Sequence, residues 1–311
     1  MHFAAGRFTL VFGLIAGVAV CFAQSALVDP ELPGMEHSWK LKLLSFVPEP
    51  GRTAGVYLKV RINGGRPLRL VLDSGAEHLV VSSSLASDMA LPAGQPLSLI
   101  GFGGPAKTDG VSTVARTVEI GPLTLHDCPV DVVPYKVVAG ADGVVPLVLF
   151  SDYLVRLDLP GKVLELTPYQ QGEASRERFT AALKVRAVLF VRTVLNGMHN
   201  GYYLLDTGAA HNAISRTTAL ELGDPASQTE MRSVRGASGD SEVPQVKVVV
   251  HFRAAGHEIA SDDVVLVNLD TFSRFNGVEV AGLLGYPALR AYVLTVDYRR
   301  SMVRMQAAGE R

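Results

Sequence analysis

Hydrophobic and polar residues alternate along several short stretches of the chain. In the first half, apolar residues occupy every second position from Val56 to Ile62 and again from Leu68 to Leu72. The same spacing recurs in the second half from Val246 to Val250. Alternation with a period of two is typical of a strand that buries one face, so these stretches predict a mainly β protein.

Two short segments have the ends expected of helices instead. One runs from Ser82 or Ser83 to Met89, and the other runs from Ser215 to Leu222. A serine can cap the first turn of each helix, and Gly223 is placed to end the second one. We therefore expect one short helix in each half of the chain.

The two halves are copies of one unit. Asn63-Gly64 in the first half matches Asn196-Gly197 in the second, and Asp73-Ser74-Gly75-Ala76 matches Asp206-Thr207-Gly208-Ala209. The offset is the same for both motifs, because 196 minus 63 and 206 minus 73 are each 133. An internal repeat constrains the architecture, so we expect two homologous β lobes related by a pseudo-twofold axis.

The repeat and the composition of the segments around it divide the chain. We expect a signal peptide in residues 1–23, an N-terminal extension in 24–52, a first lobe in 53–168 and a second lobe in 181–311. Residues 169–180 are polar and lack a strand pattern, so they form the predicted linker. The sequence leaves open whether residues 24–52 contain a strand or are a removable pro-segment.

The first 23 residues have the layout of a secretory signal peptide. Arg7 precedes an apolar run from Phe8 to Phe22, and small residues allow cleavage after Ala23 or Ala26. This run of about 15 residues is shorter than the roughly 20 that a membrane-spanning helix needs, so cleavage is favoured over a retained anchor. We expect a periplasmic or secreted protein that has no membrane contact after cleavage.

Charge and cysteine content exclude several classes of function. The 29 Lys and Arg residues nearly balance the 30 Asp and Glu residues, which leaves a formal net charge of −1. The protein therefore lacks a global positive field that would attract nucleic acid or anionic lipid. The two cysteines, Cys21 and Cys128, are too few for a disulfide scaffold or a multi-cysteine metal centre. We expect Cys128 to be a small buried hydrophobic residue.

The candidate chemistry lies at two aspartates. Asp73 and Asp206 each follow an apolar strand pattern and start an Asp-Ser/Thr-Gly motif. A carboxylate at the end of a buried strand is costly unless it is hydrogen-bonded, paired or used. If the lobes pack about a pseudo-twofold axis, the two carboxyl groups meet and share one proton. Such a pair can hold a water, take its proton as general base and protonate the scissile amide as general acid.

Other interpretations of the doubled motif stay open at this point. A single Asp-Ser/Thr-Gly is a common turn signal, so both copies could be structural turns whose carboxyl groups lie far apart. The cleft could also belong to a peptide-binding protein without catalytic activity. The position of both motifs in register within a duplicated unit favours the catalytic pair.

The doubled motif resembles that of the retropepsin-like aspartic proteases, in their bacterial two-lobe form, and the similarity covers most of residues 53–307. It implies an acid-protease fold with two mainly β, barrel-like lobes and the active site in the cleft between them. It also implies an aspartic endopeptidase that uses Asp73 and Asp206 to cleave a peptide or protein substrate, without a cofactor. Residues implied to support the two active-site loops are Ser74, Gly75, Thr207 and Gly208.

The resemblance further implies a flap, which is a mobile hairpin that covers the substrate. A glycine-dense tip suits a lid that must bend, although ordinary hairpin turns are the alternative. The candidate flap residues are Gly101, Phe102 and Gly103 in the first unit and Gly236, Ser238 and Gly239 in the second.

One segment departs from the family pattern. The second unit has Leu283-Leu284-Gly285, whereas the first has Val144-Val145-Pro146 at an offset of 139. Proline removes a backbone donor and fixes φ, so the first active-site loop could be supported differently from the second. This departure is the reason to keep an inactive peptide-binding protein as the alternative function.

His78 and His211 each lie five residues beyond one of the two aspartates. One His and one Asp per unit are fewer than the three or four ligands that zinc needs, so we expect structural or surface roles and no metal site. Because both units lie in one chain, a monomer can assemble the whole cleft.

Overall fold

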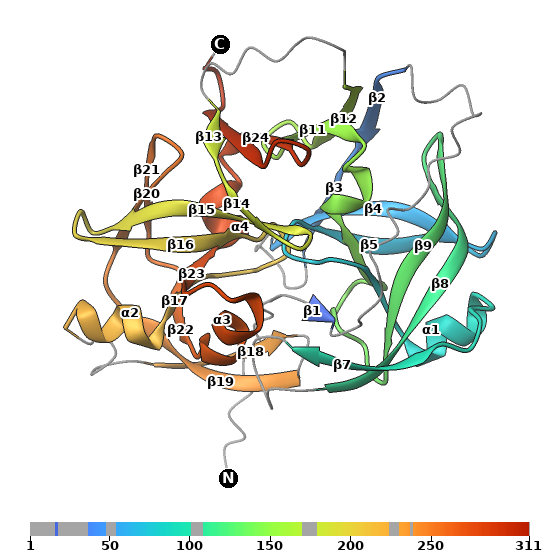
Figure 1. Cartoon of the computed structure of the whole chain (residues 1–311), viewed down its shortest axis with the longest axis horizontal. Helices are drawn as coiled ribbons and strands as arrows, with labels where there is room; N and C mark the ends of the chain where they lie inside the picture. Colours follow the sequence, from blue (N-terminus) through green and yellow to red (C-terminus); the bar gives the residue numbers. More distant parts are fainter. Residues whose placement is uncertain are drawn as a thin grey trace.

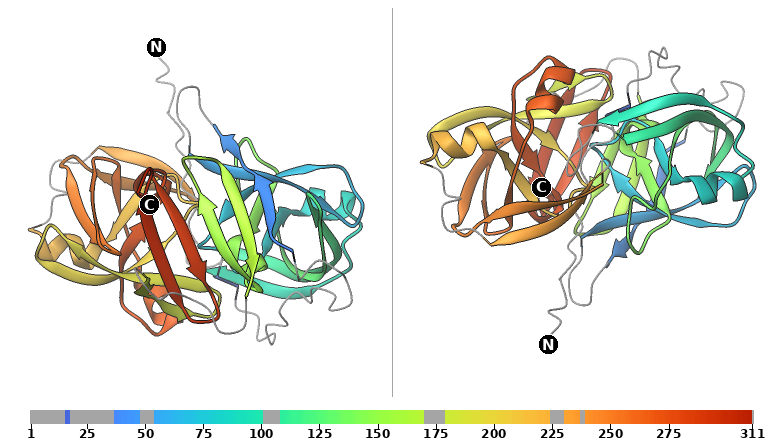
Figure 2. Two further views of the ribbon diagram at one scale, coloured as in Figure 1. Left: turned by 90° about the horizontal axis from the view of Figure 1, so that it is seen from above. Right: turned by 90° about the horizontal axis from the view of Figure 1, so that it is seen from below.

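The computed structural model describes residues 16–17, 37–47, 54–100, 108–169, 179–223, 230–236 and 239–310. Two lobes built mainly of β-strands lie side by side, as Figures 1 and 2 show. A six-stranded sheet with strands from both halves of the chain joins them along one side of the molecule. The mainly β, two-lobe architecture predicted from the repeat is confirmed.

The first lobe is a nine-stranded sheet in the order β1-β7-β8-β9-β6-β10-β5-β4-β3. A further pairing between β8 and β4 closes six of these strands, β8-β9-β6-β10-β5-β4, into a barrel. The alternating stretches predicted to be strands lie in β4 and β5, whose inward-facing residues are buried. The strands are β1 (Ala16–Gly17), β3 (Leu44–Phe46), β4 (Gly55–Ile62), β5 (Leu68–Asp73), β6 (Leu79–Ser82), β7 (Gln95–Ile100), β8 (Thr108–Ile120), β9 (Leu123–Val133) and β10 (Gly143–Pro146).

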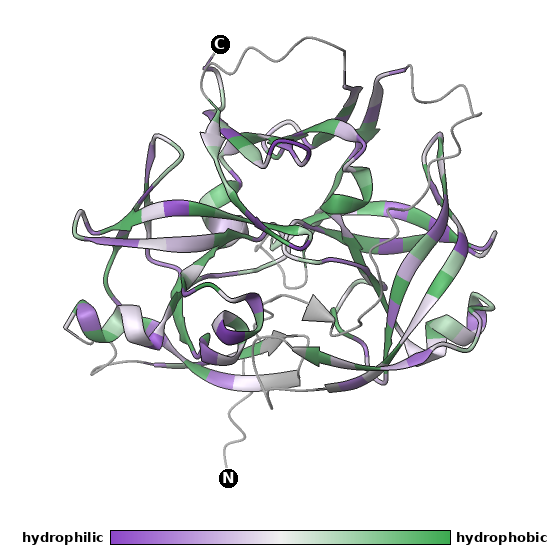
Figure 3. Ribbon diagram, in the orientation of Figure 1, coloured by the Kyte–Doolittle hydropathy of each residue, from purple (hydrophilic) through white to green (hydrophobic). Residues whose placement is uncertain are grey.

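The second lobe repeats this arrangement in a ten-stranded sheet, in the order β18-β19-β22-β17-β23-β16-β15-β20-β21, with β14 paired to β15. Figure 3 shows hydrophobic and hydrophilic residues alternating along the strands of both lobes. The strands are β14 (Leu183–Val185), β15 (Val188–Leu195), β16 (His199–Leu205), β17 (Asn212–Ser215), β18 (Met231–Gly236), β19 (Gly239–Val246), β20 (Val250–Ala254), β21 (His257–Ser261), β22 (Val264–Val267) and β23 (Val280–Leu284).

The prediction of one strand across Val246–Val250 is wrong. β19 ends at Val246 and β20 begins at Val250, while Val248 and Val249 between them are exposed. β19 pairs with β22, whereas β20 pairs with β15 and β21, so the chain changes partner strands at this point. Residue type alone cannot show such a change, and the apolar alternation simply continues across the break.

The helix predicted in each lobe is confirmed. Ser82 caps α1 (Ser83–Asp88), and Ser215 caps α2 (Arg216–Glu221) by accepting a 3.0 Å hydrogen bond from the Thr218 amide. Within its described residues, the second lobe also contains α3 (Asp270–Asn276) and α4 (Tyr286–Leu289). Neither of these two helices has a side-chain cap at its start, which is the signal that identified the other two. A short 3-10 helix, η1 (Leu147–Phe150), follows β10 in the first lobe.

The sheet that joins the lobes has the order β13-β25-β24-β11-β12-β2. At its centre β11 pairs with β24, with Val155 opposite Val296 and Leu157 opposite Leu294. Exchanging the halves by the offset of 139 turns the first pair into the second, so the pseudo-twofold axis passes between these strands. The strands are β2 (Trp39–Lys42), β11 (Tyr153–Asp158), β12 (Val163–Pro168), β13 (Thr180–Ala181), β24 (Tyr292–Asp297) and β25 (Met302–Ala307).

Part of the N-terminal extension is built into the fold. β2 forms the outer strand of the joining sheet, and β3 pairs with β4 of the first lobe. Most of the predicted linker, residues 170–178, lies outside the described residues, and so does most of the predicted signal peptide.

Cys128 is fully buried, as expected, and burial raises the pKa of its thiol to about 12. No helix in the described ranges is long and apolar enough to cross a membrane.

Candidate active site

The two predicted aspartates meet where the lobes join. Asp73 is the last residue of β5, and Asp206 directly follows β16. Both are buried, with exposed fractions of 2% and 0%. Their carboxyl groups lie within hydrogen-bonding distance of each other. This geometry excludes the interpretation in which the two motifs are separate turns with distant carboxyl groups.

The hydroxyls next to the aspartates tie the two loops together. Ser74 Oγ donates to the Leu205 carbonyl and accepts from the Thr207 amide, at 2.8 and 3.0 Å. Thr207 Oγ1 donates to the Leu72 carbonyl and accepts from the Ser74 amide, at the same two distances. Among the described residues, the partners of both hydroxyls lie across the lobe boundary, and the two sets of bonds are related by the pseudo-twofold axis. The four bonds hold the aspartates in register.

The glycines of the two motifs allow the carboxyl groups to approach. A Cβ atom on Gly75 would lie 2.9 Å from Cγ of Asp206, and one on Gly208 would lie 2.5 Å from Cγ of Asp73. Both distances are shorter than real side chains tolerate, so only glycine fits. The Gly75 amide donates to Asp73 Oδ1 at 2.6 Å, and the Gly208 amide donates to Asp206 Oδ1 at 3.0 Å.

Burial and mutual repulsion perturb both carboxyl groups. Burial raises the pKa of Asp73 from 3.8 to about 6. Burial, together with the charge of Asp73, raises the pKa of Asp206 well above its usual value. Ala209 also donates to Asp206 Oδ1, whereas Oδ2 accepts from no N–H or O–H group of the described residues. The two carboxyl groups therefore do not both ionise readily, and the pair holds one proton between them.

The proline of the first lobe is matched by a second difference between the units. In the second lobe, the Gly285 amide donates to Oδ1 of Asn212 at 2.8 Å. At the same positions the first lobe has Pro146, which has no amide hydrogen, and Leu79, which has no side-chain acceptor. Pro146 keeps its strand register, opposite Asp73. The proline thus leaves no acceptor unsatisfied at this position, and both loops keep their geometry.

An ion pair crosses the lobe boundary near the first aspartate. Glu77 follows the first motif and is nearly buried, and its Oε1 lies 3.2 Å from Nε of Arg186 in the second lobe. The Arg186 guanidinium also stacks over the ring of Phe275, 5.0 Å from its centroid. The position related to Glu77 by 133 is Ala210, so the pair exists on one side of the axis only. The sequence shows that Glu77 and Ala210 differ, but it does not show that Arg186 is the partner of Glu77.

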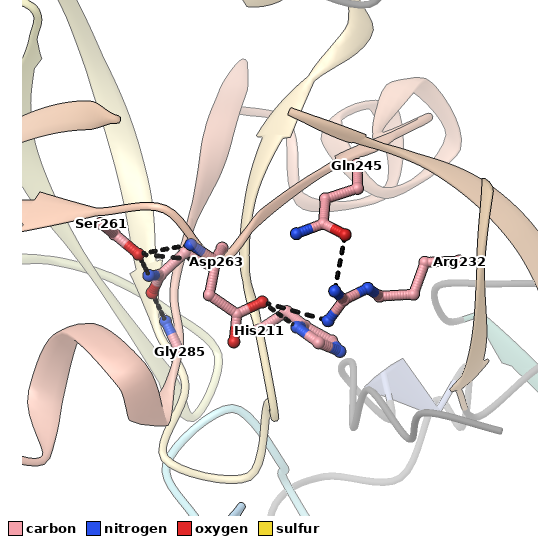
Figure 4. Close-up of polar contacts among 7 residues, drawn as sticks. His211, Arg232, Gln245, Ser261, Asp263 and Gly285 are labelled. Atoms are coloured by element: carbon pink, nitrogen blue, oxygen red, sulfur yellow. Dashed lines mark hydrogen bonds and ion pairs between the residues drawn. The ribbon is translucent and has the colours of Figure 1, made fainter. Parts of the chain in front are cut away.

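His78 and His211, the two histidines that follow the motifs, each contact an aspartate of their own lobe. Nδ1 of His78 lies 3.1 Å from Asp131 Oδ1, and Nδ1 of the fully buried His211 is hydrogen-bonded to Asp263. Figure 4 shows Arg232 of β18 beside the same carboxylate, at 3.6 Å, and bonded to Gln245 of β19. The contacts of Asp263 with His211 and Arg232 connect the β18–β19 hairpin with the loop that follows Asp206.

The Asn212 amide makes further contacts in the same region. Its Nδ2 donates to Ser261 Oγ at 2.9 Å, while its Oδ1 accepts from the Gly285 amide at 2.8 Å. Within the described residues, no group of three or more His, Cys, Asp or Glu side chains could hold a metal ion.

The segments that contain the flap candidates connect β7 with β8 and β18 with β19, and these two strand pairs lie on the side of the molecule opposite the joining sheet (Figure 1). Gly236 and Gly239 pair with each other next to the tip of β18–β19. Gly101, Phe102, Gly103 and Ser238 lie outside the described residues. A role for either hairpin as a flap therefore stays a prediction.

Comparison with known families agrees with this geometry. The family model described as aspartyl protease matches the chain twice, at residues 58–150 and 191–288. The two matches begin 133 positions apart, which is the offset of the two Asp-Ser/Thr-Gly motifs. No curated protein matches the chain. Because the two matches together cover more than half of the sequence, the chain belongs to the aspartyl protease family, in its two-lobe retropepsin-like form.

Proposed function

We propose that the protein is an aspartic endopeptidase that hydrolyses peptide bonds with a water activated by Asp73 and Asp206. One observation carries the proposal: two buried carboxyl groups of different lobes lie within hydrogen-bonding distance and have raised pKa values. Membership of the aspartyl protease family supports protease activity in general, and it is consistent with a catalytic role for Asp73 and Asp206.

The proposed reaction follows from the protonation states. In the proposed reaction Asp73 is the ionised member of the pair, and it takes a proton from the bound water as the water oxygen attacks the scissile carbonyl carbon. Asp206 gives its proton to the carbonyl oxygen, which forms a neutral gem-diol. When the C–N bond breaks, Asp73 returns its proton to the leaving nitrogen and one diol hydroxyl gives a proton to Asp206. The pair thereby regains its starting state with one proton.

Digestion of a mixed peptide library tests the activity. We expect the wild-type protein to cleave internal peptide bonds and pepstatin to inhibit the cleavage. Asp73→Asn should remove the activity while the circular dichroism spectrum stays unchanged. Library cleavage that persists in the Asp73→Asn protein would show that another group performs the hydrolysis.

The alternative, a peptide-binding protein without catalysis, was motivated by Pro146. Pro146 is a weak argument for this alternative. It has no amide hydrogen to donate, but Leu79 stands where the second unit has the acceptor Asn212, so no acceptor is left without a donor. The alternative predicts that peptides bind without being cleaved at any pH, which the same library digestion tests.

We also propose that the protein is exported and acts as a monomer on peptide or protein substrates in the periplasm or outside the cell. The support is the arrangement of residues 1–23 and the presence of both lobes in one chain. Mass spectrometry of the protein from a secreting host should find a mature chain that begins after Ala23 or Ala26. A chain that retains Met1 and stays with the membrane fraction would contradict cleavage.

A further inference from the structure

A peptide has a direction, whereas the two aspartates and the hydrogen bonds that support them are related by the pseudo-twofold axis. The bonds made by Ser74 and Thr207 are the same on both sides of this axis. They give a peptide no reason to bind in one direction rather than the other. A preferred direction must therefore come from residues beside the aspartates that differ between the two units.

On one side of the axis, the loop after Asp206 contacts the first lobe through apolar residues. Ala210 in this loop is 2% exposed. It belongs to an apolar cluster whose other buried members lie between residues 46 and 144, and these include Leu97 and Leu99 of β7. Apolar contacts therefore connect this loop with a strand next to the candidate flap residues. We call this side, from Ala210 to β7, the apolar flank.

On the other side, the loop after Asp73 contacts the second lobe through an ion pair. Oε1 of Glu77 lies 3.2 Å from Nε of Arg186, whose guanidinium stacks over the ring of Phe275 at the end of α3. Phe275 packs against an apolar cluster that includes Val234 of β18. We call this side, from Glu77 to β18, the charged flank. Each flank runs from the loop after an aspartate to the outer strand of a candidate flap, so the two flanks are counterparts.

An insertion in the second unit builds the charged flank. Val133 and Val267 are equivalent, because they lie opposite the serines that cap α1 and α2. From these valines to Gly143 and Gly282 the chain advances by 10 positions in the first unit (143 minus 133) and by 15 in the second (282 minus 267). The longer segment contains α3, whereas residues 134–142 contain no helix. The aromatic support of Arg186 therefore exists on one side of the axis.

The charged flank exposes its basic groups more than its acidic ones. The side chain of Glu77 is 5% exposed, and that of Arg186 is 34% exposed. The adjacent pair, whose charges act on Glu77, follows the same order, with Asp131 at 0% and His78 at 19%. A ligand at this flank therefore meets a basic group before it meets a carboxylate. An arginine stacked on an aromatic ring keeps the N–H groups at the edge of its plane for a carboxylate.

We propose that Arg186 determines specificity: the charged flank favours a substrate with an Asp or Glu side chain on one side of the scissile bond, and the apolar flank favours an apolar side chain on the other. This inference rests on the proposed function, because it names the substrate class of the same two aspartates. The acidic side chain also fixes the direction of the peptide, since one flank attracts it and the other does not. For a partly exposed ion pair we expect a preference of about 5-fold.

A mixed peptide library tests the proposal in two arms. Mass spectrometry identifies the peptides that the wild-type protein cleaves and, separately, the peptides that the immobilised Asp206→Asn protein retains. Acidic residues should be enriched at a position on one side of the bond. Matched peptides with Glu, Gln or Lys at that position then give kcat/KM for the wild type and Kd for Asp206→Asn. Glu should exceed Gln by about 5-fold in both arms, and Lys should fall below Gln. Salt at about 1 M should reduce the ratio.

Variants at the ion pair show whether the preference depends on Arg186. Arg186→Gln should bring the ratio of Glu to Gln peptides to about 1, and Arg186→Lys should keep part of it, because the charge remains without the planar fork. Arg253→Gln, at an exposed arginine, changes the net charge equally and should keep the wild-type ratio. The double variant Glu77→Gln, Arg186→Gln leaves no unpaired carboxylate, and it decides the question if the single variant does not fold.

The two arms separate this inference from the proposed function. Peptides that bind with the Glu preference but are never cleaved would contradict the protease activity and support the role of Arg186. Four results would each overturn the role of Arg186: equal values for Glu and Gln peptides in the wild type, a preference for Lys, a ratio that persists in both variants without Arg186, or no peptide bound or cleaved at all.

Discussion

Ser74 and Thr207 each accept a hydrogen bond from the other's backbone amide and donate one to the strand that carries the other's aspartate. Four hydrogen bonds thus connect the lobes immediately behind the two carboxyl groups. Neither lobe can build this arrangement alone, so the geometry of the site depends on the association of the two units.

Removing one of these hydroxyls should loosen the site. We expect Ser74→Ala to lower the free energy of unfolding by about 2 kcal/mol, because the Leu205 carbonyl and the Thr207 amide lose their buried partner. Peptide cleavage should fall as well, since the aspartates lose register. Urea denaturation measures the first effect. Ser74→Thr is the matched control, because it keeps the hydroxyl and copies the second unit; a loss as large in this control would contradict the role of the hydrogen bonds.

The rate of peptide cleavage should depend on pH as a bell-shaped curve. The acidic limb reflects protonation of Asp73, whose pKa is about 6, and the alkaline limb reflects loss of the Asp206 proton. The active form with one proton therefore lies at higher pH than it would for exposed aspartates. Initial rates across the pH range measure both limbs. An optimum below pH 3.8, the ordinary pKa of aspartate, would show that burial does not control the pair.

The free energy of unfolding should depend on whether Asp206 is ionised. The folded-state pKa of Asp206 is raised, so its contribution to stability is fully present below the unfolded-state value of 3.8 and is lost as the pH rises toward the folded-state value. Asp206→Asn has no such loss and can still accept hydrogen bonds from Gly208 and Ala209. We expect it to match the wild type in free energy of unfolding near pH 4 and to be more stable than the wild type at pH 7. Urea denaturation at both pH values measures the difference. If the variant and the wild type differed in free energy of unfolding by the same amount at pH 4 and pH 7, the link between stability and the pKa of Asp206 would be refuted.

The ion pair across the lobe boundary should matter most when Glu77 is ionised. Arg186→Met leaves the Glu77 carboxylate without its counter-charge and should cost about 1–3 kcal/mol at pH 7. The pKa of Glu77 is raised by burial, and Arg186 opposes that rise. The cost should therefore shrink as the pH falls and Glu77 is protonated. Adding Glu77→Gln to Arg186→Met should restore part of the stability. A cost independent of pH would indicate that only the packing of Arg186 on Phe275 was lost.

The sequence predicted the features that repeat. Two Asp-Ser/Thr-Gly motifs at one offset predicted two equivalent lobes, and the serines at positions 82 and 215 located two helices correctly. Alternation failed at Val246–Val250, because a pattern of residue types does not record which strand is the partner.

Contacts between distant residues could not be derived in the same way. Glu77 differs from its counterpart Ala210, yet nothing in the sequence connects it with Arg186, which lies 109 residues further along the chain. That Leu79 compensates for Pro146 follows from the hydrogen bond that the Gly285 amide donates to Asn212 in the second unit, and the sequence does not record that bond. Where the two units differ, the structure was needed to show which differences belong together.

The rate of peptide cleavage by Asp206→Asn, compared with that of the wild-type protein, tests the shared-proton pair most directly. Unfolding curves of both proteins at the assay pH verify that the variant is folded. We predict a loss of about 10²–10⁴-fold or more, the typical contribution of a general acid or base. Cleavage by the folded variant at a rate near that of the wild type would contradict the account.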